Sequence, residues 1–137
     1  MDDDELGEIY VSTKTIAVVG ASSDTSKPGH RIPRYLQSQG FRVIPVSPKG
    51  GEIFGESVYT SLKEVDVPVD VVDVFRPAEE APAIAQDAVA IGAKVLWLQT
   101  GIVSADAAEI ARAEGLKVVM NTCMGETHAR LGLGPGP

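Results

Sequence analysis

Short apolar runs alternate with helix-like stretches along the chain, and this alternation restricts the fold more than any other feature. Five runs are rich in Val, Ile or Leu and are bounded by turn residues, as buried strands are. These runs are Thr15–Val19, Arg42–Val46, Val69–Phe75, Lys94–Leu98 and Lys117–Met120. Strands that alternate with helices are joined by right-handed crossovers and pair in parallel. The sequence therefore predicts a parallel sheet of five strands.

Helix signals fill the intervals between these strands. The expected helices cover residues 29–39, 77–91 and 104–114, with a short helical turn at 61–64. Gly40, Gly92 and Gly115 each end one of the three helices, because glycine readily takes the left-handed conformation that closes a helix. We therefore expect an α/β fold: a Rossmann-like doubly wound parallel five-stranded sheet with helices on both faces and the strand order 3-2-1-4-5.

The composition fits one globular domain. A chain of 137 residues, with 44% hydrophobic and 23% charged residues, can bury a core without disulfides. We expect a single domain over residues 1–137, with residues 1–12 as a loosely ordered acidic N-terminus and residues 134–137 as a loose tail. The net charge of −7 argues against nucleic-acid binding, because no excess of Lys and Arg is present to neutralise phosphates.

Cysteine usage and hydropathy restrict the chemistry and the location of the chain. Cys123 is the only cysteine, so the chain has no internal disulfide and no cysteine zinc cluster. The acidic N-terminus does not resemble a signal peptide, and no apolar stretch is long enough to span a bilayer. These features predict a cytoplasmic protein that binds neither membranes nor nucleic acids and holds no metal.

The loop after the first strand is the most informative candidate for a ligand site, because ligands of open parallel sheets bind beyond the carboxyl ends of the strands. Gly20, Ala21 and Ser22 open a Gly/Ser/Thr-rich turn that includes Ser26 and leads into the first helix. Small residues let a phosphate approach the backbone, and the helix N-terminus offers N–H groups to it. The turn lacks the second glycine of G-x-G-x-x-G, so a polar loop without a ligand is the alternative. Its place directly after the first strand favours binding.

The residues at the end of the second strand indicate which nucleotides the chain can bind. NAD-binding sheets usually carry Asp or Glu there to bind the ribose 2′-hydroxyl, whereas this chain has Ser47, Pro48 and Lys49. A lysine suits an extra ribose phosphate, such as the 3′-phosphate of coenzyme A or the 2′-phosphate of NADP. A solvated surface lysine is the alternative. NAD is disfavoured, and coenzyme A and NADP both remain.

The other strand ends supply further candidates. Phe75 can cover an adenine and Arg76 can pair with a phosphate, unless the two are only an edge-of-core ring and a helix-start cation. Gln99 and Gly101 bring an amide and a close-approach glycine to the same edge. Cys123 follows the fifth strand, where it either packs as a small hydrophobe or meets a thiol-bearing ligand. Nothing in the sequence fixes a base beside it, so we expect no catalytic residue.

Six motifs occur in order between Thr13 and Leu133. They are VVGAS, PVSPK, EIFGESVYTSL, VDVVDVFRP, GAKVLWLQTGI and VVMNTCMGETHARL. In this order and spacing they resemble the small stand-alone CoA-binding protein family, whose fold is similar to the CoA-binding N-terminal domain of the succinyl-CoA synthetase α subunit. The chain departs from that pattern in Asn121-Thr122, where Asp-Arg is more usual, and in Ser47-Pro48, where Asn-Pro is more usual.

The resemblance implies a role for each candidate. Gly20, Ala21 and Ser22 would cradle the pyrophosphate, and Pro48 and Lys49 would lie beside the adenosine 3′-phosphate. Phe75 and Arg76 would border the nucleotide, with Gln99 and Gly101 nearer the pantetheine path. The Asn121-Thr122 departure removes a charge pair from the edge of the site.

The leading hypothesis is a small module that binds coenzyme A or an acyl-CoA and has no catalysis of its own. The alternatives are a small NADP-binding enzyme, a CoA-thiol exchange enzyme that uses Cys123, and a regulatory subunit of a synthetase-like complex. The sequence does not choose between free coenzyme A, an acyl-CoA and another adenine nucleotide, and it identifies no protein partner.

Overall fold

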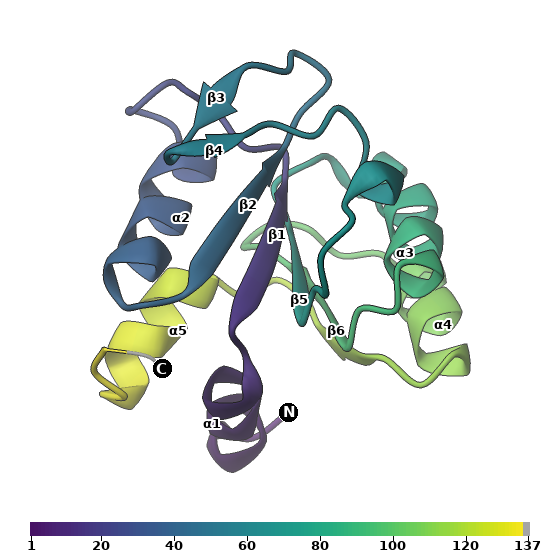
Figure 1. Cartoon of the computed structure of the whole chain (residues 1–137). Helices are drawn as coiled ribbons and strands as arrows, with labels where there is room; N and C mark the ends of the chain where they lie inside the picture. The colour runs from purple at the N-terminus through teal and green to yellow at the C-terminus, as the bar shows by residue number, and fades with distance from the viewer. Residues whose placement is uncertain (136–137) are drawn as a thin grey trace.

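Five parallel strands form the central sheet of the protein, whose computed structural model describes residues 1–135. The strands are β1 (Thr15–Val19), β2 (Arg42–Val46), β5 (Val71–Val74), β6 (Val95–Leu98) and β7 (Lys117–Val119). The helices are α1 (Asp3–Ser12), α2 (Pro28–Ser38), α3 (Ala81–Ala90), α4 (Ala105–Ala113) and α5 (Met124–Leu131). One face of the sheet is covered by α1, α2 and α5 and the other by α3 and α4 (Figure 1). The expected Rossmann-like α/β fold is confirmed.

The order of the strands differs from the expected 3-2-1-4-5. Hydrogen bonding gives β2-β1-β5-β6-β7, which is 2-1-3-4-5 when the five strands are counted along the chain. The third strand, β5, therefore pairs with β1 instead of β2. All four residues of β5 are buried, which suits a strand with neighbours on both sides.

Pro45 explains why β2 lies at the edge of the sheet. Proline has no N–H to donate and is confined to edge strands. The carbonyl of Pro45 accepts a hydrogen bond from the Tyr59 N–H at 3.1 Å, and the Ser47 N–H donates to the Tyr59 carbonyl at 2.9 Å. A short irregular segment therefore covers the carboxyl end of this edge.

The expected helices are confirmed, with small changes at their ends. Residues 77–91 begin as a short 3₁₀ turn, η2 (Ala78–Glu80), before α3. Ser104 caps α4 by accepting a hydrogen bond from the Ala107 N–H at 3.1 Å. The expected turn at 61–64 is the 3₁₀ helix η1 (Leu62–Glu64), which Ser61 caps.

Residues 1–12 were expected to be a loosely ordered terminus, and this expectation is wrong because most of the segment forms α1. Asp2 caps the helix by accepting a hydrogen bond from a first-turn N–H at 2.9 Å. Leu6, Ile9 and Tyr10 share one face and are buried against the sheet layer. The Tyr10 hydroxyl donates to the Met124 carbonyl at 2.6 Å. Burial of this apolar face outweighs repulsion within the acidic run.

Besides α1, one helix and one hairpin have no counterpart among the expected elements. The helix is α5, and the hairpin consists of β3 (Glu52–Ile53) and β4 (Glu56–Ser57). Phe54 and Gly55 form the turn of the hairpin, with φ of 60° and 76°. Two positive φ values are typical of a type I′ turn, which suits glycine and strains phenylalanine. Burial of the Phe54 ring holds it in this conformation.

The C-terminal tail is only partly described. Gly134 and Pro135 belong to no helix or strand, and residues 136 and 137 of the expected loose tail lie outside the described residues. The assignment of residues 1–137 to a single domain stays a prediction. Among the helices described, none is long and apolar enough to cross a membrane.

Candidate functional site

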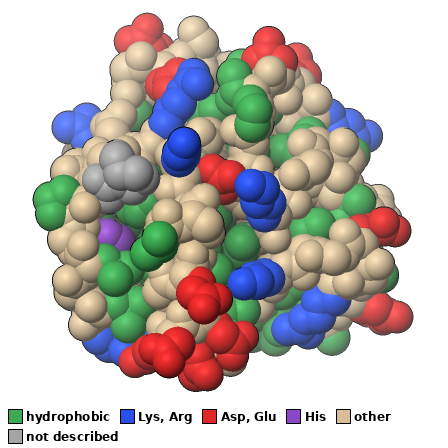
Figure 2. All heavy atoms as spheres, turned by 60° about the horizontal axis from the view of Figure 1, so that its bottom comes forward, with side chains coloured by type: hydrophobic (Ala, Val, Ile, Leu, Met, Phe, Trp, Pro, Cys, Tyr) green, Lys and Arg blue, Asp and Glu red, His purple; other side chains and the backbone are tan. Residues whose placement is uncertain are grey.

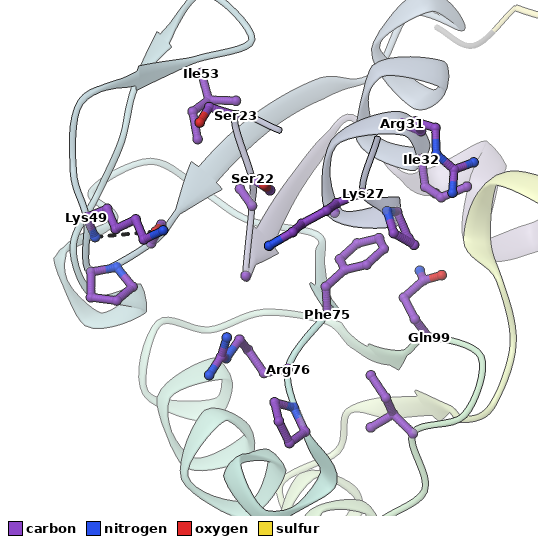
Figure 3. Close-up of a pocket in the computed structure, with 18 of the residues that line it drawn as sticks. Ser22, Ser23, Lys27, Arg31, Ile32, Lys49, Ile53, Phe75, Arg76 and Gln99 are labelled. Atoms are coloured by element: carbon purple, nitrogen blue, oxygen red, sulfur yellow. Dashed lines mark hydrogen bonds between the residues drawn. The ribbon is translucent and has the colours of Figure 1, made fainter. Parts of the chain in front are cut away.

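A pocket of about 970 Å³ opens at the carboxyl ends of the central strands (Figure 3). Of the eleven residues predicted from the sequence to form a site, nine line it. These are Gly20, Ala21, Ser22, Pro48, Lys49, Phe75, Arg76, Gln99 and Cys123. They come from the segments after all five strands of the sheet. The fold thus brings together residues that are about 100 positions apart in the sequence, as expected for an open parallel sheet.

The floor of the pocket depends on two glycines. Gly20 follows β1 with φ of 93°, and a Cβ there would lie 2.8 Å from the Phe75 carbonyl oxygen and 2.9 Å from the Arg76 Cδ. Gly29, in the first turn of α2, would bring a Cβ to 2.7 Å from the Gly20 carbonyl oxygen. These approaches are too close for any side chain. The start of α2 therefore packs directly on the loop after β1.

Three N–H groups of this loop are already occupied within the protein. The N–H groups of Gly20 and Ala21 donate to the Val46 carbonyl at 3.0 and 3.4 Å, and the Ser22 N–H donates to the Gly29 carbonyl at 3.2 Å. These bonds hold the loop in place. The N–H groups of Lys27 and His30 at the start of α2 are also engaged, and Pro28 has none, so an anion here would be met by the Gly29 N–H, the positive end of the helix and side chains.

Ser26 and Gly101, also predicted from the sequence, are not among the residues that line the pocket. The Ser26 hydroxyl donates to Asp24 Oδ1 at 2.7 Å, and this bond lowers the pKa of Asp24. The Gly101 N–H donates to the Asn121 side-chain oxygen at 2.7 Å. Asn121 has φ of 53°, a left-handed conformation that asparagine tolerates. Asn121 therefore fixes the loop after β6 through its bond to the Gly101 N–H.

Four cationic side chains line the pocket: Lys27, Arg31, Lys49 and Arg76. Lys27 and Arg31 are not among the residues predicted from the sequence. Their spacing of four at the start of a helix was a readable signal, because it places both side chains on one face. Acidic side chains gather instead at the end of the molecule where α1 lies (Figure 2). The net charge of −7 therefore coexists with a basic pocket.

Arg76 is held by an acidic neighbour on its outer side. Its Nε and Nη2 atoms donate to the two carboxylate oxygens of Glu80 at 3.1 and 2.7 Å. This hydrogen bonding raises the pKa of Arg76 and lowers that of Glu80. Both side chains are nearly half exposed, so water screens the pair.

The hairpin of β3 and β4 adds Glu52 and Ile53 to the pocket lining. Two contacts outside the pocket fasten it. Arg42 donates to both carboxylate oxygens of Glu56 at 2.9 and 3.2 Å. The Gln37 side chain donates to the Phe54 carbonyl at 2.8 Å. The hairpin is thus tied to both β2 and α2.

Gln99, Cys123 and Glu126 lie together at another part of the pocket wall. Cys123 immediately precedes α5, and its Sγ accepts a hydrogen bond from the Glu126 N–H at 3.4 Å. Burial raises the pKa of the Cys123 thiol, and nearby acidic groups add to this effect. The thiol is therefore neutral near pH 7 and is a weak nucleophile.

His128 does not line the pocket. Its ring is 1% exposed and packs against the rings of Tyr10, Tyr35 and Phe41. His128 Nδ1 lies 2.9 Å from the Tyr35 hydroxyl. The pocket therefore offers Cys123 no imidazole base. Within residues 1–135, no group of three or more His, Cys, Asp or Glu side chains is placed to hold a metal ion.

The fold and this basic pocket define a Rossmann-like α/β protein of the kind that binds ligands at the carboxyl ends of its strands. Residues 14–129 match the CoA binding domain family, and the chain belongs to this family. The resemblance stated from the sequence motifs is thereby confirmed.

Known proteins similar to the chain include stand-alone chains and a much larger enzyme. The uncharacterized protein YneT of Bacillus subtilis is 37% identical over 125 residues, which are 91% of this chain and 93% of YneT. The structure of cell-free ID.343 from Thermus thermophilus is 41% identical, with a TM-score of 0.91, and the match covers 96% of this chain and 99% of that one. An ADP-forming acetate–CoA ligase of Methanocaldococcus jannaschii is 27% identical over 133 residues, covering 89% of this chain and 19% of the ligase.

Proposed function

We propose that this chain binds coenzyme A or an acyl-CoA in the pocket, as a module without catalysis of its own. The observation that carries the proposal is that Lys27, Arg31, Lys49 and Arg76 line one pocket in an otherwise acidic chain. Coenzyme A carries phosphate at two separate places, the pyrophosphate and the ribose 3′-phosphate. Cations from three separate segments suit such a ligand better than one with a single phosphate.

The start of α2 suits the pyrophosphate. Gly29 lets the first turn of the helix approach the loop after β1, and Lys27 and Arg31 flank that turn. A helix N-terminus with two adjacent cations is a favourable place for a double negative charge. Small Ala21 and Ser22 leave room for it, although their N–H groups are engaged in the loop itself.

Lys49, after β2, is assigned to the ribose 3′-phosphate. It lies on the other side of the pocket mouth from Arg31 (Figure 3). Phe75 extends from the end of β5 between these groups and is assigned to the border of the nucleotide. Gln99 and Cys123 form the part of the wall assigned to the pantetheine arm. The wall carries no charge at these two residues, and the neutral thiol of Cys123 suits an uncharged chain.

Two further features support a binding module in preference to an enzyme. No histidine lines the pocket, and the Cys123 thiol is held neutral. The family includes chains of similar length to this one, such as YneT, besides segments of ADP-forming acetate–CoA ligases.

Titration calorimetry of the purified protein tests the proposal, with coenzyme A, 3′-dephospho-coenzyme A, NADP and NAD as ligands. We expect coenzyme A to bind most tightly and loss of the 3′-phosphate to weaken binding about tenfold, as removal of one charge-assisted contact does. Lys49→Ala should produce a similar loss for coenzyme A and almost none for the dephospho compound. Lys117→Ala, which removes an exposed lysine outside the pocket, is the matched control.

The outcomes separate the candidate functions. Binding of NADP without binding of coenzyme A would overturn the proposal in favour of a nicotinamide enzyme. Equal affinities for coenzyme A and 3′-dephospho-coenzyme A would show that Lys49 does not bind the 3′-phosphate. Release of a modified coenzyme A after incubation, detected by mass spectrometry, would show that the chain does perform chemistry.

A further inference from the structure

Asp73 is a fully buried carboxyl group in the middle of β5, between Val72 and Val74. Its Oδ1 accepts a hydrogen bond from Gln99 Nε2, and its Oδ2 has no hydrogen-bond partner among residues 1–135. Burial raises the pKa of Asp73 to about 7. Burying a carboxyl group with one unpaired oxygen lowers the stability of the fold, whereas a valine at this position would not. The proposed ligand contacts do not account for it, because Asp73 does not line the pocket.

Gln99 connects Asp73 to the pocket wall. The Gln99 side chain is only 5% exposed, yet it lines the pocket. Its Nε2 donates to Asp73, and its Oε1 accepts a hydrogen bond from the Met124 N–H at 3.4 Å. Met124 is the first residue of α5 and directly follows Cys123. One side-chain amide therefore links the buried strand β5 to the start of α5.

The two ends of this link determine how the amide is oriented. The backbone N–H of Met124 can only donate, so the oxygen of the Gln99 amide faces Met124 and its nitrogen faces Asp73 Oδ1, which accepts from it. The opposite orientation would place a donor against a donor at Met124. Without Asp73, the Gln99 nitrogen would be buried and unpaired, and the amide would lose the partner that fixes it.

We propose that Asp73 is a positioning residue of the pocket: through Gln99 it holds the first turn of α5 against the sheet and so places the wall formed by Gln99, Cys123 and Glu126. This inference rests on the proposed function in taking that wall to contact the pantetheine arm of coenzyme A. Asp73 itself touches no ligand. Its effect is confined to one end of the ligand, because the cations that meet the phosphates lie on other segments.

A pair of ligands tests this position-specific effect. Coenzyme A has the pantetheine arm, and adenosine 3′,5′-bisphosphate keeps the adenosine 3′-phosphate without that arm. We expect Asp73→Leu to weaken coenzyme A about tenfold and the bisphosphate by less than about twofold, measured by calorimetry. Asp73→Asn should keep coenzyme A within about threefold of the unchanged protein, because its side-chain oxygen still accepts from Gln99. Equal losses for the two ligands in Asp73→Leu would overturn the proposal.

A double variant separates positioning from loss of stability. Asp73→Leu leaves the Gln99 nitrogen buried and unpaired, which alone destabilises the fold. Combining Asp73→Leu with Gln99→Leu removes both polar partners, and we expect it to recover much of the melting temperature. The weaker binding of coenzyme A should nevertheless persist, since the Gln99 bond to the Met124 N–H is still missing. Recovery of coenzyme A affinity together with stability would assign Asp73 a structural role only and overturn the proposal.

Hydrogen exchange of the Met124 backbone N–H, monitored by NMR, tests the link to α5 without any ligand. Asp73→Leu should speed this exchange, and Asp73→Asn should leave it nearly unchanged. If coenzyme A does not bind the unchanged protein, the proposed function fails while this readout still tests the link to α5. Unchanged exchange in Asp73→Leu would overturn the positioning role.

Discussion

The carbonyl oxygen of Gly20 lies 2.7 Å from the point that a Cβ on Gly29 would occupy. This relationship joins the end of β1 to the first turn of α2, and it leaves no space for a side chain at position 29. The N–H group of Ser22 donates to the Gly29 carbonyl and closes the loop between them. The geometry of the proposed pyrophosphate site is therefore set by backbone contacts, with side-chain cations arranged around it.

Gly29→Ala should push α2 away from the loop after β1. Because the obstacle is a backbone oxygen that cannot rotate aside, we expect a loss of about 1–3 kcal/mol in the free energy of unfolding. Coenzyme A affinity should fall at least about tenfold, since the helix N-terminus moves. Chemical denaturation and calorimetry measure the two effects.

Gly7→Ala is the matched control for this substitution. Gly7 lies within α1, where a Cβ would meet nothing within 4 Å. Alanine is the better helix former, so this variant should gain about 0.5–1 kcal/mol and bind coenzyme A normally. A Gly29→Ala protein with unchanged stability would contradict the close approach.

Several features of this fold were readable from the sequence, including some that were read wrongly. Pro45 within the second strand is a signal of an edge strand, and it would have excluded the order 3-2-1-4-5. Leu6, Ile9 and Tyr10 have helical spacing, and Asp2 precedes Glu5 by three residues as in a capping box. The composition of the acidic terminus obscured that pattern.

Other features depend on contacts that no local pattern contains. The pairing of Asp73 with Gln99 joins two residues 26 positions apart and requires β5 and β6 to be neighbours in register. Phe54 adopts a positive φ because its ring is buried beside α2, whereas local preferences disfavour phenylalanine in that conformation. The segments that form the pocket could be predicted from strand ends, because parallel topology places them together. The hydrogen bonds that organise it could not.

Phe54→Ala should loosen the hairpin that brings Glu52 and Ile53 to the pocket. The ring is 8% exposed and packs in the core layer beneath α2. Its removal should cost about 2–4 kcal/mol of stability, because alanine leaves a cavity and keeps the unfavourable φ. Coenzyme A should also bind more weakly, as calorimetry would measure. Val11→Ala, at a side chain that is 77% exposed, should change neither property. A fully stable Phe54→Ala protein would show that the ring does not anchor the hairpin.

The buried carboxyl of Asp73 should make stability depend on pH. Its pKa rises from the ordinary value of 3.8 to about 7 on folding. The group is neutral in both states below about pH 4, and stability falls as pH rises from about 4 to 7, because the unfolded chain then gives up the proton that the buried carboxyl keeps. The loss by pH 8 is at most about 4 kcal/mol. Tyr10 and Cys123, whose pKa values are raised by burial, stay neutral over this range.

Asp73→Asn removes that titration. The difference in melting temperature, variant minus wild type, should therefore become more positive as the pH is raised from 5 to 8. Asp106→Asn, at an exposed position in α4, controls for the loss of one negative charge and should give a difference that is nearly independent of pH. A pH-independent difference for Asp73→Asn would mean that Asp73 keeps an ordinary pKa in the folded protein.

Glu80 should compete with a ligand phosphate for Arg76. Glu80 occupies both the Nε and Nη2 donors of Arg76, and both side chains are accessible to water at the edge of the pocket. A phosphate that pairs with Arg76 must displace this carboxylate or share the guanidinium with it. Glu80→Gln should therefore raise coenzyme A affinity about two- to fivefold at low salt, with a smaller gain at high salt.

Glu79→Gln provides the control, because it removes the same charge from the neighbouring position without touching Arg76. A gain of equal size in both variants would assign the effect to net charge near the pocket and not to the Arg76 pair. A gain confined to Glu80→Gln, and abolished when Arg76→Ala is added, would identify Arg76 as a phosphate ligand whose availability is set by Glu80. The Glu80 carboxylate would then lower the affinity for coenzyme A, while it keeps the Arg76 guanidinium extended at the edge of the pocket, where a phosphate can bind it.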